Sequence, residues 1–307
     1  MNKIIILMAT LALLALACTK EKTDYQADTG TDIPTVTEFK EVFSTQHDSY
    51  SLRLEALNGT LYTGYNEIRI SLFDTQSKQA IQASEVTFLP ISSNTAGLQA
   101  SCPHRYKLLD KPTEKHHAGF AVFTQPSSSS SWKLYISFKV GDKLYSLQQE
   151  VNVAPQTNKN VGFTSFLGKD EQHYVIALVA PQKPKVGENA LVAGIYQYHL
   201  PEHPPTANFP DPAQFRYSEV QGYTLALDPR MPEASMGNHS SPNNKDLLQQ
   251  ADGLYAGLVN YTMTGNWTLN FMLLNRQGRI LKGTQVPTDF TPGVEGVKSD
   301  LYIDVLF

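Results

Sequence analysis

Apolar and polar residues alternate one by one around the only two tryptophans of the chain. A period of two with apolar residues on one face is typical of a half-buried antiparallel strand. Turn-forming residues follow each segment, at 141–142 and at 276–278, so both predict a strand that ends in a turn. The alternating apolar positions are Trp132, Leu134, Ile136, Phe138 and Val140 in the first segment, and Trp267, Leu269, Phe271 and Leu273 in the second.

The surroundings of the two tryptophans also match, in segments that keep one order in both halves of the chain. The segments SLRLEAL (51–57) and YVIALVA (174–180) open the two copies, and LQQEVNV (147–153) and LYIDVLF (301–307) close them. This order indicates a duplicated unit over residues 36–154 and 160–307, and the alternative is a chance likeness among strands. Between these segments, GYN (64–66) matches GEN (187–189), SCP (101–103) matches SSP (240–242), and HAGFAVFTQP (117–126) matches YAGLVNYTMTG (255–265).

Two copies of six or seven short strands predict an all-β chain with two tandem immunoglobulin-like β-sandwich domains. Each tryptophan is expected to be the largest side chain of its core. The only helical pattern is KDLLQQAD (245–252), which predicts at most a turn or two of helix. The predicted organisation is a signal peptide over 1–17, a flexible tether over 18–35, a first sandwich over 36–154 and a second sandwich over 160–307.

The beginning of the chain has the layout of a secretory signal. One basic residue, Lys3, precedes an apolar run from Ile4 to Ala17 that is short for a membrane span. The run ends in ALAC, which resembles the lipobox of bacterial lipoproteins, although Leu stands at the middle position and Ala where Leu is usual. We therefore expect cleavage before Cys18, a lipid on its thiol, and attachment to the outer membrane of a bacterial envelope, on either face. The alternative is an ordinary cleaved signal with an incidental cysteine.

Composition narrows the function classes. A net charge of −4 implies no affinity for nucleic acid. If Cys18 carries lipid, Cys102 has no partner and no internal disulfide forms. The sequence carries no G-x-S-x-G elbow, no H-E-x-x-H motif and no phosphate-binding loop, so we expect a protein that is not an enzyme.

The stretch DPRMPEASMGNHSSPNN (228–244) places Met231, Met236 and His239 in a segment rich in turn-forming residues. Thioether sulfur is a soft donor that suits Cu(I), and imidazole accommodates both copper oxidation states. The spacing therefore points to a Cu(I) site of these three side chains, with Met263 as a fourth donor. The alternative is that both methionines cover the end of the sandwich and that His239 caps a turn.

A weaker candidate lies in the first copy, where Cys102 and His104 stand near His116 and His117. A lone thiol beside histidines suits copper or zinc. The alternative is a small buried cysteine with solvent-facing histidines. His199 and His203 lie in a Pro-rich insertion, and we interpret them as loop residues without a ligand role.

The second copy resembles the YtkA-like and FixH-like domains of bacterial envelope proteins. The resemblance rests on MPEASMGNHSSPNN and on a later pattern of Gly253, Tyr255, Gly257, Met263, Gly265 and Trp267. It implies an immunoglobulin-like sandwich, an association with copper or cytochrome oxidase systems, and a two-copy lipoprotein of the Bacteroidota type. The first copy lacks the methionines, so we expect at most one metal ion per chain.

Two functions follow as expectations. The first is a membrane-anchored envelope lipoprotein that binds copper through the segment 228–244, called the Met/His loop below. The second is a surface structural or recognition module that binds a protein or a glycan and no metal. Tyrosines that we expect in loops would serve such contacts: Tyr50, Tyr62, Tyr65 and Tyr217.

Overall fold

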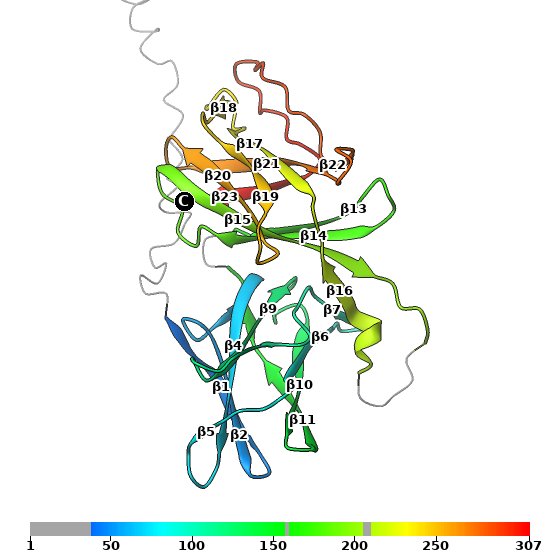
Figure 1. The fold of residues 1–307 in the computed structure, drawn as a ribbon. Helices are drawn as coiled ribbons and strands as arrows, with labels where there is room; N and C mark the ends of the chain where they lie inside the picture. Colours follow the sequence, from blue (N-terminus) through cyan, green and yellow to red (C-terminus); the bar gives the residue numbers. More distant parts are fainter. Residues whose placement is uncertain (1–37, 157–159, 205–209) are drawn as a thin grey trace, which may run out of the picture.

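The structure is a computed structural model that describes residues 38–156, 160–204 and 210–307 (Figure 1). The predicted signal peptide, the predicted lipidation site Cys18 and the predicted tether lie outside these residues. The regular secondary structure of the described residues is made of strands and one short 3₁₀ turn, η1 (Pro212–Phe215), which confirms the all-β prediction. Among the described residues, no helix has the length and apolar character needed to cross a membrane.

The N-terminal half, residues 38–156, packs two antiparallel sheets around one core. Six strands form the first sheet and four form the second, and two short strands form a separate parallel pair. The first sheet has the order β1 (Phe39–His47), β2 (Tyr50–Leu57), β4 (Gly64–Asp74), β9 (His116–Phe123), β8 (Leu109–Lys111), with β5 (Ala80–Ile81) beside β4. The second has the order β11 (Lys143–Val151), β10 (Ser131–Val140), β6 (Thr87–Ser93), β7 (Gln99–Ser101), and the pair is β3 (Leu61–Tyr62) with β12 (Val153–Ala154).

The C-terminal half, residues 160–204 and 210–307, forms one sheet of eleven strands that folds over a second core. Three short strands extend it at the sides, where β16 (Arg216–Glu219) pairs with β15, β18 (His239–Ser240) with β17, and β23 (Tyr302–Leu306) with β21. The main order is β13 (Phe163–Leu167), β14 (His173–Ala180), β15 (Gly187–His199), β20 (Tyr255–Tyr261), β19 (Lys245–Gln249), β17 (Thr224–Met231), β21 (Asn266–Leu274), β22 (Ile280–Lys282).

The predicted helical turn over 245–252 is wrong, because residues 245–249 form β19. This strand pairs with β17 on one side and with β20 on the other, and it thereby joins the two layers of the C-terminal half. Leu247 points into the core while Leu248 is 53% exposed, which is strand alternation rather than a helical stripe. Pairing with two neighbours outweighs the local helix preference of the sequence.

The matched segments occupy matching places in the two halves. Gly64 pairs with Phe123 where β4 meets β9, and Gly187 pairs with Tyr261 where β15 meets β20. Further along, both tryptophan strands place a leucine opposite a proline. These pairs are Leu134 with Pro90 and Leu269 with Pro229.

Two kinds of hydrogen bond made by buried side chains also recur. Asn66 receives a hydrogen bond from the Tyr62 amide and donates to the carbonyls of Tyr62 and Gly64. Asn189 makes the same three bonds with the amide of Lys185 and the carbonyls of Lys185 and Gly187. The two tryptophans donate from Nε1 to equivalent carbonyls, from Trp132 to Gln125 and from Trp267 to Met263.

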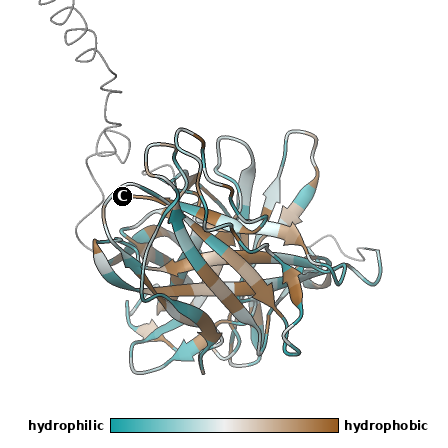
Figure 2. Ribbon diagram, turned by 90° about the horizontal axis from the view of Figure 1, so that it is seen from above, coloured by the Kyte–Doolittle hydropathy of each residue, from teal (hydrophilic) through white to brown (hydrophobic). Residues whose placement is uncertain are grey.

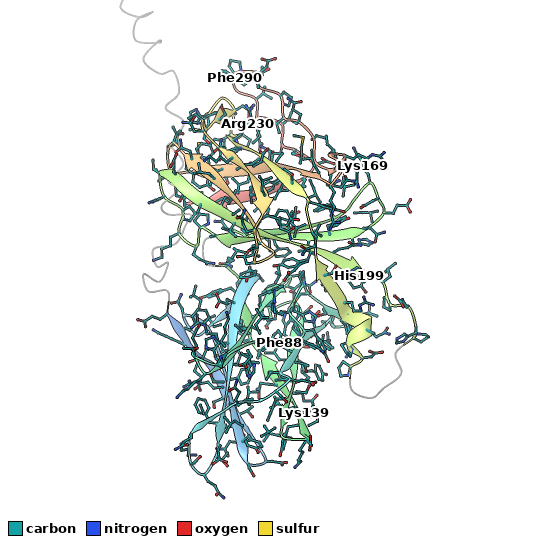
Figure 3. All side chains as sticks on the ribbon, in the orientation of Figure 1. Phe88, Lys139, Lys169, His199, Arg230 and Phe290 are labelled. Atoms are coloured by element: carbon teal, nitrogen blue, oxygen red, sulfur yellow. The ribbon has the colours of Figure 1, made fainter. Side chains whose placement is uncertain are left out.

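Each tryptophan lies in its own core, and a third apolar cluster joins the halves. Apolar residues are concentrated on the strands (Figure 2), and side chains fill both bodies, with Phe88 in the N-terminal core (Figure 3). Arg105 of the N-terminal half and Glu219 of the C-terminal half form an ion pair, with 2.6 Å between Nη2 and Oε1, which reinforces the contact between the halves. The joining cluster consists of Phe120, Val122, Val175, Ala177 and Tyr196.

Candidate functional site

The Met/His loop lies at one end of the C-terminal half, where β18 folds back against the end of β17 (Figure 1). In this short pairing Met231 stands directly opposite His239. Directly paired residues of neighbouring strands point to the same face of the sheet, with Cβ atoms about 5 Å apart. The methionine and the histidine therefore share one face, although eight positions separate them along the chain.

Trp267 extends this pair into a row of three side chains. Arg230 pairs with Thr268, so Met231 and Trp267 stand at the next position along the same two strands. The ring of His239 lies 6.0 Å from the ring of Trp267. The two rings are arranged edge to face, and the side chain of Met231, which stands between them in the strand order, has no exposed surface.

The other two predicted donors lie beside this row. Met236 is partly buried and packs against the C-terminal core, and its carbonyl accepts the backbone N–H of His239 at 3.2 Å. Met263 is 37% exposed, and its carbonyl holds the Trp267 indole. The structure thus brings all four predicted residues to one end of the half, with only Met231 fully inside the core.

His239 has a defined orientation. Its Nε2 lies 2.8 Å from Oγ1 of Thr262, which follows β20. This contact fixes the imidazole plane next to Trp267 and leaves Nδ1 as the nitrogen that is free to meet a ligand if Nε2 carries the proton.

A segment that the sequence did not single out covers this loop. Residues 283–300 run over the outer end of the half, with Phe290 near its tip (Figure 3). The amide N–H of Gly296 donates to the Pro232 carbonyl at 2.6 Å, and the Asn238 side chain donates to the Pro287 carbonyl at 3.0 Å. The covering segment therefore holds the loop in place. The apolar side chains Phe290, Val294 and Val297 remain largely exposed on it.

The N-terminal half differs at the same place. Ser92, which pairs with Trp132, occupies the position that Met231 has in the C-terminal half. The predicted absence of methionine donors in this half therefore extends to the residue beside the tryptophan.

Cys102 and His104 are both buried in the N-terminal half. Burial raises the pKa of the Cys102 thiol far above its usual range, which disfavours the thiolate that binds metals. Burial also lowers the pKa of His104 to about 4, and its Nδ1 lies 2.7 Å from the Cys102 carbonyl. A neutral imidazole that donates to this carbonyl satisfies the geometry, and the pair therefore fits a packing role.

His116 and His117 are not solvent-facing, because they are 7% and 6% exposed. They begin β9, whereas His104 bridges to Ala121 further along that strand. Four residues of strand span about 13 Å, so the structure does not bring these histidines to His104. Among the described residues no group of three or more His, Cys, Asp or Glu side chains is suited to hold a metal ion.

The four tyrosines expected in loops all lie in strands: Tyr50 in β2, Tyr62 in β3, Tyr65 in β4 and Tyr217 in β16. His199 is the last residue of β15, with Nε2 at 2.7 Å from Ser218 Oγ. His203 lies in the following loop. The loop interpretation therefore holds for His203 and is wrong for His199.

The fold and the site define an all-β sandwich protein with a Met/His/Trp row at one end. No protein-family model matches the chain, and no curated protein matches it. The resemblance to the YtkA-like and FixH-like domains therefore stays a prediction.

Proposed function

We propose that this protein is a non-enzymatic lipoprotein of the bacterial envelope, anchored to the membrane through a lipid on Cys18. We further infer that its body consists of two tandem domains of the YtkA-like kind, over residues 36–154 and 160–307. The matching registers and the recurring asparagine bonds at Asn66 and Asn189 support one ancestral unit that was copied.

We propose that the C-terminal half binds one Cu(I) ion at the row of Met231, His239 and Trp267. The observation that carries this proposal is the direct cross-strand pairing of Met231 with His239. A thioether and an imidazole on one face form a soft donor set of the kind that Cu(I) prefers. The face of a tryptophan ring attracts a cation as well. Met236 and Met263 are the nearest further sulfur donors.

The burial of Met231 is compatible with this role. An apolar shell around a metal controls the access of solvent, and here the shell is the C-terminal core. His239 and Met236 are only partly buried, so the entry path lies on their side. The proposal therefore expects Met231 to be the inner donor and His239 the outer one.

A Cu(I) titration of the mature protein against a chromophoric competing chelator tests this assignment. We expect one equivalent to bind. The variants Met231→Leu and Met236→Leu keep volume and apolarity but lose sulfur. We expect each to weaken binding by about tenfold or more, while Met272→Leu, a partly buried methionine in β21, serves as the matched control.

Equal affinity in the parent protein and in the Met231→Leu/Met236→Leu double variant would show that the loop is structural. Two tightly bound equivalents would contradict the expectation of one site per chain. In a Trp132→Phe background Trp267 is the only tryptophan, so quenching of its fluorescence by Cu(I) reports the row independently.

The anchor is tested separately. We expect the parent chain to fractionate with membranes and to incorporate labelled fatty acid, and we expect Cys18→Ser to lose both properties. Retention of the label in Cys18→Ser would exclude lipidation at this residue. Copper affinity should be unchanged by Cys18→Ser, so failure of one proposal leaves the other standing.

A further inference from the structure

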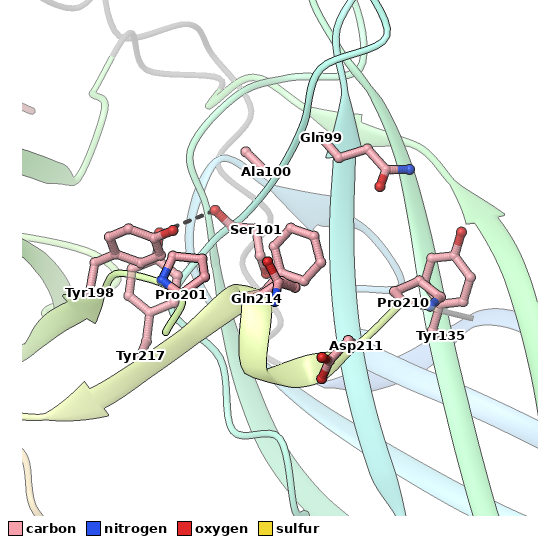
Figure 4. Close-up of a pocket in the computed structure, with 11 residues that line it drawn as sticks. Gln99, Ala100, Ser101, Tyr135, Tyr198, Pro201, Pro210, Asp211, Gln214 and Tyr217 are labelled. Atoms are coloured by element: carbon pink, nitrogen blue, oxygen red, sulfur yellow. Dashed lines mark hydrogen bonds between the residues drawn. The ribbon is translucent and has the colours of Figure 1, made fainter. Parts of the chain in front are cut away.

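A pocket of about 650 Å³ lies between the two halves of the molecule, and no residue of the Met/His loop is among its described lining residues (Figure 4). Strands β7 and β10 form its wall on the N-terminal side. The end of β15, η1 and β16 form its wall on the C-terminal side. Ligand pockets in proteins typically have volumes of about 300–1,000 Å³, so this pocket is large enough for a small molecule.

Aromatic rings from both halves line the pocket. Tyr198 and Tyr217 lie side by side with ring centroids 5.1 Å apart, and the Tyr217 hydroxyl donates to the Ser101 carbonyl at 3.2 Å. Phe215 of η1 and Tyr135 of β10 also line the pocket. The hydrogen bond to Ser101 fixes one ring against the other half, which makes the wall pre-formed.

Polar groups lie among these rings. The side chain of Gln99 is exposed at the rim. Gln214 donates from Nε2 to the backbone carbonyl of His203 at 2.7 Å. This bond orients the Gln214 amide, whose Oε1 remains an acceptor. Asp211 accepts the Ala213 N–H at 2.9 Å and is the one charged residue among the described residues that line the pocket.

We propose that this pocket binds a short neutral oligosaccharide. Sugar rings combine apolar C–H faces with hydroxyl groups at their edges. Flat aromatic side chains match the faces, and amide and carboxylate groups match the hydroxyls. The carboxylate of Asp211 disfavours an anionic sugar.

An extended peptide fits this pocket less well. A peptide that adds to a sheet needs a free strand edge, and β7 is the edge strand of its sheet. However, β7 has three residues, and its Ser101 carbonyl already accepts the Tyr217 hydroxyl. The pocket therefore favours the glycan over the protein ligand, and it does so independently of any copper site.

Calorimetry of the full mature chain carrying Cys18→Ser tests the proposal. The probes are linear gluco-, xylo- and manno-oligosaccharides, with an oligogalacturonate and a proline-rich peptide as comparison ligands. We expect at least one neutral probe to bind. Tyr198→Ala and Phe215→Ala should each weaken it by about tenfold or more, because aromatic anchors dominate such contacts.

Two controls keep the result interpretable. Gln99→Ala alters an exposed side chain without affecting the core, and we expect it to weaken binding about threefold with an unchanged melting temperature. Tyr302→Ala removes an exposed tyrosine of β23, outside the pocket, and should bind like the parent.

Three results would overturn the proposal. One is the failure of every neutral probe to bind. Another is neutral-sugar binding that persists in the Tyr198→Ala/Phe215→Ala double variant. The third is ring-dependent binding of the peptide or the oligogalacturonate in place of the neutral sugars.

Discussion

Replacement of Asn66 or Asn189 by alanine probes the equivalence of the two halves most sharply. Both side chains are almost fully buried, with exposed fractions of 8% and 5%. Each receives one hydrogen bond from a backbone amide and donates two to backbone carbonyls, with donor–acceptor distances of 2.7–3.1 Å. We therefore expect the two substitutions to destabilise their own halves to a similar extent.

The expected magnitude follows from the number of bonds. A typical intramolecular hydrogen bond contributes about 1 kcal/mol net, so the loss of three lowers the free energy of unfolding by about 3 kcal/mol. Asp in place of Asn keeps the acceptor but turns a carboxylate toward two carbonyl oxygens. We expect Asn66→Asp and Asn189→Asp to be at least as destabilising as alanine.

The two tryptophans allow each half to be followed alone. In a Trp267→Phe background, Trp132 fluorescence reports the N-terminal half during urea unfolding, and Trp132→Phe leaves Trp267 as the reporter of the C-terminal half. Asn260→Ala is the matched control, because it removes only a 3.3 Å hydrogen bond that is exposed to solvent.

Losses below about 0.5 kcal/mol at both asparagines would refute the reasoning from hydrogen bonds. A loss of about 3 kcal/mol at one asparagine with none at the other would refute the equivalence of the halves.

Three further predictions concern buried groups. Above pH 6.5, His104 binds no proton in the folded or the unfolded state. Between pH 6.5 and the folded-state pKa of about 4, only the unfolded state binds a proton, so the free energy of unfolding falls by about 3 kcal/mol as the pH drops to 4. We expect His104→Gln to flatten this loss, which urea titrations at several pH values would measure. Gly257→Ala should lower the melting temperature more than Gly119→Ala. At Gly257 the new Cβ would lie 2.5 Å from the backbone carbonyl oxygen of Lys245, whereas at Gly119 it would meet the flexible end of the Leu108 side chain. A larger loss for Gly119→Ala would contradict this account. Because burial raises the pKa of Cys102, we expect a thiol reagent to modify it only after unfolding, and rapid labelling of the native protein would show otherwise.

The sequence predicts the all-β class and the inward side chains well, because strand alternation around Trp132 and Trp267 is a local signal. It also predicts the matched segments, whose bonds through Asn66 and Asn189 are local as well. The strand β19 could not be predicted, because its state depends on two neighbouring strands that are distant in the sequence.

The candidate sites also include one that the local sequence predicts and one that it does not. The four Met and His residues gather at one end of a half because three of them belong to one hairpin. The covering segment 283–300 and the pocket between the halves are assembled by packing of remote segments, since Tyr135 and Phe215 line the same pocket from different halves of the chain. Such approaches leave no periodic signal in the chain.

X-ray absorption at the copper edge of the Cu(I)-loaded mature protein tests the proposed metal site most directly. We predict a mixed shell of sulfur and nitrogen neighbours, and we predict that Met231→Leu reduces the sulfur contribution and His239→Ala the nitrogen contribution. A shell of nitrogen and oxygen alone, unchanged by Met231→Leu, would contradict the assignment of the row to Cu(I).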